Sequence, residues 1–327
     1  MHAPQDFELC RPATLDDAVA ALAAGETARP VAGGTDLLPN LRRGLLAPAR
    51  LVDLSAVRGF ADVEVRDDGS ATLGAGLTLA ALADHAALMQ RFPALAEAAR
   101  SVAGPGHRSA ATLGGNLCQD TRCVFYNQSE WWRAANGWCL KRGGDTCHVA
   151  PQGSRCHAAF CSDLAPVLLA LGAEAEMQSV RSTRRAALET LYRDDGAAHL
   201  TLDAGELLVC LHLPAPAGRC RYAKARARGA MDFPLAAVAV ALACEDGLVT
   251  HLRVGVAGTN SHPLLLQGTG AFFGSALDEA ALAKLGKRVA QQVSPMRSTT
   301  TPANHRRQVA QALVLRLLRQ MAADPNG

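Results

Sequence analysis

The strongest constraint on this 327-residue chain is a segment of 44 residues, 118–161, whose composition differs from the rest. It holds six of the ten cysteines and all three tryptophans, and it has no apolar periodicity. In a reducing compartment, cysteines clustered in this way indicate metal or redox chemistry and not a disulfide framework.

Composition and charge exclude several classes of protein. Apolar residues make up 49% of the chain, and its length suits two or three domains of a soluble globular protein. The 33 basic and 30 acidic residues are dispersed, which argues against a nucleic-acid-binding protein. No apolar run is long enough to span a membrane, and residues 1–5 do not begin a secretory signal, so we expect a cytosolic protein.

Helix and strand signals alternate outside this segment. Helices are predicted for residues 14–24, 37–45, 78–89, 95–102, 163–171 and 280–293 and for those after Pro302. Strands are predicted for residues 30–32, 51–54, 173–180, 206–213, 222–228 and 249–256. A buried apolar element is predicted for residues 233–243, and a hairpin that turns at Asp68-Gly69 is predicted for residues 63–73. The Pro/Gly stretch 214–218 predicts a domain boundary.

Two glycine-rich turns are candidates for binding an anion. They are Ala32-Gly33-Gly34-Thr35-Asp36 and Thr112-Leu113-Gly114-Gly115-Asn116. Paired glycines let backbone N–H groups converge on an anion, since no Cβ blocks the approach. Two such loops could hold the two phosphates of a dinucleotide, although each alone could equally be an ordinary tight turn. Neither matches a Rossmann or P-loop motif.

In this order and spacing, the two loops resemble the flavin subunits of the molybdenum hydroxylases. Further similarity lies in Ser162-Asp163-Leu164-Ala165-Pro166 and in Lys224 followed by Arg228 and Asp232. The resemblance implies an α+β fold: a two-subdomain FAD-binding (PCMH-type) unit and a C-terminal α+β domain, as in carbon monoxide dehydrogenase flavoproteins. We therefore expect subdomains at 1–57 and 58–217 and a C-terminal domain at 218–327.

The resemblance also assigns the flavin contacts. The loops would hold the pyrophosphate and ribityl chain, Asp163 would contact the sugar alcohol, and Lys224 would lie near the isoalloxazine ring. The predicted FAD-binding residues are Pro30, Val31, Ala32, Gly33, Gly34, Thr35, Asp36, Leu37, Val102, Thr112, Leu113, Gly114, Gly115, Asn116, Asp163, Leu208 and Lys224. We expect no separate catalytic acid, base or nucleophile.

Four cysteines inside the 118–161 segment are candidate metal ligands: Cys123, Cys139, Cys147 and Cys156. Thiolates suit iron–sulfur clusters or zinc, and spacings of 16, 8 and 9 positions leave cluster, zinc and unligated thiols open. An insertion at this point with these cysteines is similar to the flavin subunits of 4-hydroxybenzoyl-CoA reductases, which implies one 4Fe-4S cluster.

The neighbours of these cysteines carry further expectations. The tryptophans should form a small core or shield the cluster, and Lys141, Arg142 and Arg155 form either a solvated face or a docking patch for an acidic ferredoxin. Cys118 and Cys161 should be small buried residues at the ends of the insertion.

The resemblance implies an electron-transfer subunit. Ferredoxin would deliver electrons through 4Fe-4S to FAD, then to a 2Fe-2S small subunit and a molybdenum-cofactor large subunit that reductively dehydroxylates 4-hydroxybenzoyl-CoA. The implied assembly is a dimer of heterotrimers. One alternative is the flavin subunit of a related hydroxylase running oxidatively. Another is a zinc-stabilised flavoprotein whose loop serves only for docking.

Overall fold

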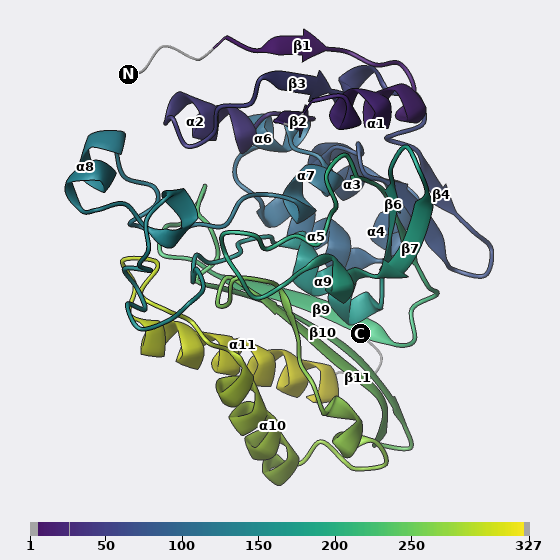
Figure 1. The fold of residues 1–327 in the computed structure, drawn as a ribbon. Coiled ribbons are helices and arrows are strands. Elements are labelled where there is room, and N and C mark those ends of the chain that lie inside the picture. Colours follow the sequence, from purple (N-terminus) through teal and green to yellow (C-terminus); the bar gives the residue numbers. More distant parts are fainter. Residues whose placement is uncertain (1–5, 26, 324–327) are drawn as a thin grey trace.

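The computed structural model describes residues 6–25 and 27–323, and its N-terminal part is a small parallel sheet. Strands β1 (Glu8–Cys10), β3 (Arg50–Asp53) and β2 (Ala28–Val31) pair in that order, with helices α1 (Leu15–Ala23) and α2 (Leu37–Arg42) beside them (Figure 1). Thr14 caps α1 by accepting a hydrogen bond from the Asp17 amide. The predicted helices and strands of this region are confirmed, apart from the unforeseen β1. Residues 1–5, on which the expectation of no secretory signal rests, lie outside the described residues.

The second part is a five-stranded antiparallel sheet. Its order is β4 (Val63–Val65), β5 (Ala71–Gly74), β8 (Leu207–Leu213), β6 (Glu174–Gln178) and β7 (Thr183–Ala187). One face supplies Leu73, Leu211 and Ala175 to the main core. The helices of this part are α3 (Leu79–Asp84), α4 (Ala86–Arg91), α5 (Pro93–Ser101), α6 (Pro105–Ala110), α7 (Leu113–Leu117) and α9 (Leu164–Leu171).

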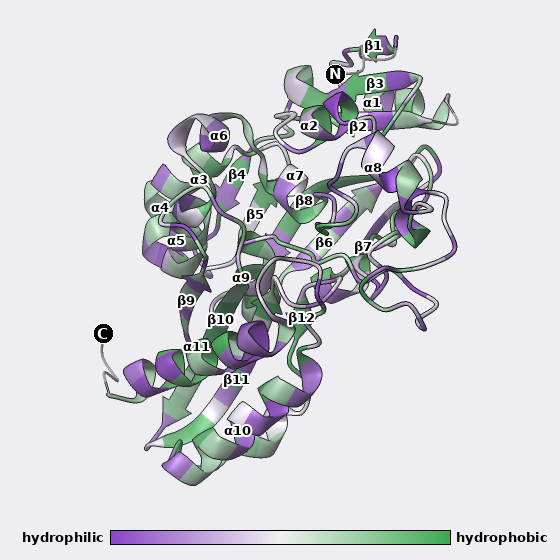
Figure 2. Cartoon of the chain, turned by 90° about the vertical axis from the view of Figure 1, so that its left-hand side faces the viewer, coloured by the Kyte–Doolittle hydropathy of each residue, from purple (hydrophilic) through white to green (hydrophobic). Residues whose placement is uncertain are grey.

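The C-terminal part is a four-stranded antiparallel sheet. It runs β12 (Leu264–Leu265), β11 (Leu248–Ala257), β10 (Ala236–Glu245), β9 (Arg219–Ala225), and α10 (Glu279–Gln292) and α11 (Ala303–Ala323) cover one face (Figure 1). Along β10, the larger Val238 and Val240 face these helices, whereas Ala237 and Ala239 join the main core with α9. Figure 2 shows apolar β10 between striped, amphipathic helices and the rest of the protein.

The cysteine-rich segment projects from this body (Figure 1). It contains only α8 (Glu130–Ala135) and the short 3-10 helix η2 (Leu140–Arg142). Its two ends meet, because Arg122 and Ala159 exchange backbone hydrogen bonds of 2.7 Å. The segment is thus a long loop between α7 and α9 whose two ends are hydrogen-bonded to each other.

The α+β fold class is confirmed, and some element boundaries were wrong. The single helix predicted for 78–89 is two helices, since His85 ends α3 and its ring accepts a hydrogen bond from Leu88 N at the start of α4. Strands β7 and β1 and helix α6 were not predicted. No helix in the described ranges is long and apolar enough to cross a membrane.

Candidate functional site

The structure places the first glycine loop against the residues just before the second loop, although about 80 residues separate the two loops. Gly33 follows β2 and lies against the end of α6: a Cβ on Gly33 would lie 1.8 Å from the carbonyl oxygen of Ala110. Ala110 is two residues before Thr112, where the second loop begins. Gly34 has a φ of +68°, a conformation that glycine adopts without strain. The loop from Ala32 to Asp36 is at least partly exposed.

The second glycine loop is itself a short helix, α7. Thr112 caps it, and its hydroxyl accepts a 3.1 Å hydrogen bond from Gly115 N. Gly114 faces inward, where a Cβ would lie 2.8 Å from the Cβ of Ala75. Gly115 faces outward and is exposed, and within 4 Å its Cβ position would meet only the Thr112 hydroxyl. One glycine therefore packs the loop and the other leaves its outer face open.

Asn116 joins this loop to the segment that carries Asp163. Its side-chain oxygen accepts hydrogen bonds from the Ser162 hydroxyl at 2.6 Å and from Leu164 N at 3.4 Å. The Asn116 side chain is buried. Through these two hydrogen bonds, Asn116 holds in place the residues on both sides of Asp163.

Asp163 and Lys224, predicted from different domains, form a buried ion pair. The Lys224 Nζ lies 2.9 Å from Asp163 Oδ2, and each side chain is 5% exposed. Tyr222 donates a 2.6 Å hydrogen bond to Asp163 Oδ1, and Lys224 also donates to the Ser101 carbonyl. Burial raises the pKa of Asp163, while the positive charge of Lys224 opposes that rise.

Tyr222 was absent from the predicted site. It lies two residues before Lys224 on β9, and alternate residues of a strand share a face. Applying that period to Lys224 would have found it. Val102 follows Ser101 at the end of α5 and is half-buried, whereas Leu208 lies in β8 and is buried in the main core.

These positions form a continuous chain of contacts that fits FAD. Gly33 of the first loop packs against Ala110, two residues before the second loop. Asn116 of the second loop binds the residues on either side of Asp163, and Asp163 pairs with Lys224. The open outer face at Gly115 is a cradle that a side chain would fill. Bound FAD would supply one- and two-electron transfer, and the chain supplies its cradle and a buried cation.

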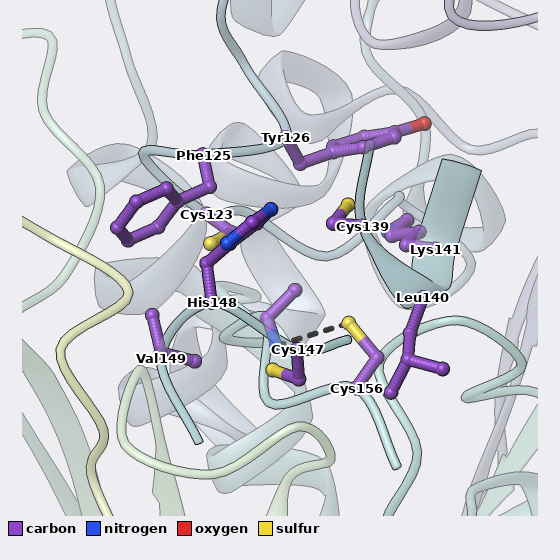
Figure 3. Close-up of a pocket in the computed structure, with 11 residues that line it drawn as sticks. Cys123, Phe125, Tyr126, Cys139, Leu140, Lys141, Cys147, His148, Val149 and Cys156 are labelled. Carbon is purple, nitrogen blue, oxygen red and sulfur yellow. Dashed lines mark hydrogen bonds between the residues drawn. The ribbon is translucent and has the colours of Figure 1, made fainter. Parts of the chain in front are cut away.

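The four candidate ligand cysteines line one cavity in the inserted segment. Each of Cys123, Cys139, Cys147 and Cys156 is at most 9% exposed. Together with Phe125, Tyr126, Lys141 and His148, among others, they surround one small space between the side chains. Figure 3 shows the four sulfur atoms arranged around this space.

The cavity disfavours free thiolates but can support bound ones. Burial raises the pKa of Cys123, and it raises the pKa of Cys156 to about 12. Backbone amides offset part of this effect: the N–H groups of Phe125 and Tyr126 act on Cys123, and Ala158 N donates to Cys156 Sγ at 3.4 Å. A bound metal would draw the protons off the thiols and accept the thiolate charge.

The separation of the sulfur atoms distinguishes between metal types. A single zinc ion holds thiolates at about 2.3 Å, which places them roughly 3.8 Å from each other. Within the described part of the chain, no three of these four cysteines have sulfur atoms all within 4.8 Å of one another. In any three of them, at least one pair of sulfur atoms is therefore farther apart than one zinc ion requires.

The surroundings of the cavity correct several expectations. The tryptophans do not line it, and Trp131 is 78% exposed on α8, so the prediction of a tryptophan core or shield was wrong for that residue. Trp132 contacts Phe125, which stacks on His148 with ring centres 5.3 Å apart. Cys118 and Cys161 lie outside the lining; Cys161 is buried as expected, and Cys118 is only partly buried.

Lys141 is buried, which contradicts its predicted place on a solvated face or docking patch. Its side chain is 6% exposed, pairs with Asp120 and lies 4.4 Å from the Tyr126 ring centre. Arg142 donates to the Gly44 carbonyl, and Arg155 pairs with Asp194 at 2.7 Å. All three basic side chains thus bind groups of the chain itself.

A chain of charges connects the cavity with the first glycine loop. From Lys141 it runs to Asp120, whose amide donates a 2.9 Å hydrogen bond to the Asp36 carboxylate. Asp36 also pairs with Arg122, whose guanidinium donates to Asn40 of α2. The Asp36 carboxylate thus anchors the start of the insertion.

Comparison with known proteins agrees with this architecture. Residues 5–216 match the FAD binding domain in molybdopterin dehydrogenase, and residues 221–321 match the CO dehydrogenase flavoprotein C-terminal domain. The carbon monoxide dehydrogenase medium chain of Afipia carboxidovorans is 28% identical over 98% of both chains. A putative xanthine dehydrogenase FAD-binding subunit of Escherichia coli K12 is 26% identical over 97% of this chain and 96% of its own.

A solved structure extends the agreement to three dimensions. A chain of reconstituted CO dehydrogenase from Oligotropha carboxidovorans superimposes with a TM-score of 0.80 at 26% identity, covering 98% of this chain and 99% of the other. The protein therefore belongs to the FAD-binding subunits of the molybdenum hydroxylases, the oxidoreductase family of the carbon monoxide dehydrogenase medium chain and the xanthine dehydrogenase FAD-binding subunit.

Proposed function

We propose that this chain is the electron-transfer flavoprotein subunit of a 4-hydroxybenzoyl-CoA reductase, with one 4Fe-4S cluster bound by Cys123, Cys139, Cys147 and Cys156. The observation that carries the proposal is the cavity in which these four buried sulfur atoms meet. Four cysteines can supply every protein ligand of a 4Fe-4S cluster. A sulfur spacing too wide for one zinc ion supports a cluster over zinc.

The proposal includes the flavin site and the domain division. FAD would be held by residues 30–37 and 112–116, by Asp163 and Lys224, and by Val102 and Leu208 as packing residues. The subdomains would be 1–57 and 58–217, with the insertion at 118–161, and the C-terminal domain 218–327. The contact chain from Gly33 to Lys224 supports this set.

The proposed partners follow from the family. The relatives include a carbon monoxide dehydrogenase medium chain, a name that implies a larger and a smaller partner. We assign a molybdenum-cofactor large subunit, a 2Fe-2S small subunit, ferredoxin as donor and a dimer of heterotrimers in the cytoplasm. The overall reaction consumes two electrons and two protons, forms benzoyl-CoA, and releases the phenolic oxygen as water.

A second candidate is the oxidative direction. The relatives also include a nicotine 6-hydroxylase medium subunit and an aldehyde oxidoreductase FAD-binding subunit. Such a subunit would carry electrons away from the molybdenum site. The added metal cavity favours the reductive assignment, since an extra low-potential centre is needed only to bring electrons in.

Metal analysis of anaerobically purified protein tests the cluster. About four iron atoms and four acid-labile sulfides per chain are expected. One zinc per chain without sulfide would refute the cluster.

The assembled complex, given reduced ferredoxin and 4-hydroxybenzoyl-CoA, should form benzoyl-CoA detectable by mass spectrometry. Cluster-containing complex that forms none, yet oxidises an aldehyde or a hydroxylatable N-heterocycle, would establish the second candidate.

A further inference from the structure

A second group of metal-binding side chains lies on the five-stranded sheet. Glu176 is on β6, and Cys210 and His212 are on β8. Residues two apart on a strand share a face, and Glu176 is the direct cross-strand partner of Cys210. Leu211, between the two β8 residues, faces the core. The pairing register therefore gathers a carboxylate, a thiol and an imidazole on the face away from the core.

The three donor atoms converge on one point. His212 Nε2 lies 2.8 Å from Glu176 Oε2 and 3.4 Å from Cys210 Sγ, and the three atoms all lie within 4.8 Å of one another. Around one zinc ion, sulfur and nitrogen ligands lie roughly 3.5 Å apart, and nitrogen and oxygen ligands roughly 3.3 Å. The two separations that involve His212 are thus within about 0.5 Å of those that a single ion requires.

The surroundings orient the imidazole and leave the carboxylate available. His212 Nδ1 lies 3.2 Å from the Thr72 hydroxyl of β5, which leaves Nε2 directed at the other two groups. Such a partner on the second ring nitrogen is usual for metal-binding histidines. Arg185, the other cross-strand neighbour of Glu176, binds Glu174 at 2.6 Å instead.

Solvent can reach the group. The side chains of His212 and Glu176 are 15% and 31% exposed, and His212 lines a surface cleft with Glu174 and Arg185. An ion can therefore enter, and water can complete its coordination. A carboxylate and an imidazole alone would form an ordinary ion pair. The thiol directed at the same nitrogen has no part in such a pair.

We propose that Glu176, Cys210 and His212 bind one zinc-like divalent cation that links β6 to β8. The mixed sulfur, nitrogen and oxygen donors suit zinc or cobalt and do not suit magnesium or calcium. On binding, the thiol proton and the proton between His212 and Glu176 pass to solvent. The site shares no residue with the cysteine cavity or the glycine loops, and it is independent of the proposed function.

Cobalt(II) titration of the full chain with FAD bound, performed anaerobically, tests the site. A thiolate-to-cobalt charge-transfer band and visible d–d bands should saturate at one equivalent. Cys210→Ser should remove that charge-transfer band. The same band should persist in Cys244→Ser, which alters an exposed cysteine elsewhere, and in Cys139→Ser, which alters the cavity.

Two further variants keep the proposal refutable if Cys210→Ser perturbs the sheet. Glu176→Gln should weaken cobalt binding at least tenfold, and Thr72→Val should weaken it roughly 10–100-fold while keeping the charge-transfer band. Retained flavin absorbance reports that each variant is folded. A band that survives Cys210→Ser, a band lost with Cys139→Ser, or unchanged affinity in Glu176→Gln would overturn the proposal.

Discussion

Replacing Lys224 by methionine should destabilise the folded protein by about 3–5 kcal/mol at neutral pH. The Asp163 and Lys224 side chains are each 5% exposed and 2.9 Å apart, so solvent screens the pair little. The variant leaves the Asp163 carboxylate buried without a countercharge, with the Tyr222 hydroxyl as its remaining side-chain partner. The double variant Asp163→Asn with Lys224→Met removes both charges and should recover most of the lost stability. Replacing a buried ion pair by uncharged groups often changes the free energy of unfolding little.

The penalty should depend on pH in a defined direction. Burial already raises the pKa of Asp163 above its ordinary value of 3.8, and Lys224 is the largest influence that lowers it. Without Lys224 the pKa rises further, so the folded state holds the proton more tightly than the unfolded state. Stability then falls as pH rises from the unfolded pKa through the folded one. The loss in Lys224→Met should therefore be smaller near about pH 5 than near about pH 8.

Urea unfolding followed by circular dichroism measures these changes. Each variant is compared with saturating FAD and after flavin removal, because bound ligand adds its own stabilisation. Lys284→Met on the exposed face of α10 is the control and should change the free energy of unfolding by less than about 0.5 kcal/mol. A loss below about 1 kcal/mol in Lys224→Met, or additive losses in the double variant, would refute the reasoning.

Substitutions at three other positions test neighbouring features. Gly115→Val should abolish FAD binding, measured by flavin absorbance, and Gly115→Ala should weaken it less, because the smaller side chain fills less of the open face; normal flavin content in the valine variant would remove Gly115 from the site. Gly33→Ala should lower stability by about 1–3 kcal/mol, since its Cβ would collide with the Ala110 carbonyl, and an unchanged melting temperature would contradict that packing. Cys139→Ser should alter or remove the low-potential electron paramagnetic resonance signal while FAD stays bound, and an unaltered signal would exclude Cys139 as a ligand.

Much of the fold was predicted from helix starts and tight turns, because these depend on residues that are close together in the sequence. The helix that follows Thr14 and the hairpin at Asp68-Gly69 lie where the sequence predicts them. The break at His85 was missed because Leu82, Ala86 and Met89 keep a helical apolar spacing across it. Strand β7 was missed because Thr183-Arg184-Arg185-Ala186-Ala187 has little apolar alternation; ion pairs of its arginines with Glu206 and Glu174 help hold this edge strand.

The residue types of the candidate site are visible in the sequence, whereas the burial of its side chains is not. Grouped cysteines and paired glycines mark chemistry directly, whereas nothing adjacent to Lys141 or Lys224 in sequence reveals that each is buried against a carboxylate. Burial depends on partners far along the chain, Asp120 for Lys141 and Asp163 for Lys224. The same distance in sequence hid Tyr222, whose partner Asp163 lies in another part of the fold.

The chain of charges between the cavity and the first glycine loop has a consequence for electron transfer. Buried ion pairs add little net stability, yet breaking one is costly, so Lys141 with Asp120 and Arg122 with Asp36 disfavour other placements of the insertion. Asp36 belongs to the loop proposed to hold FAD, and Lys141 lines the cavity proposed to hold the cluster. These pairs would therefore fix the separation between the proposed FAD and cluster sites, on which the rate of electron transfer depends.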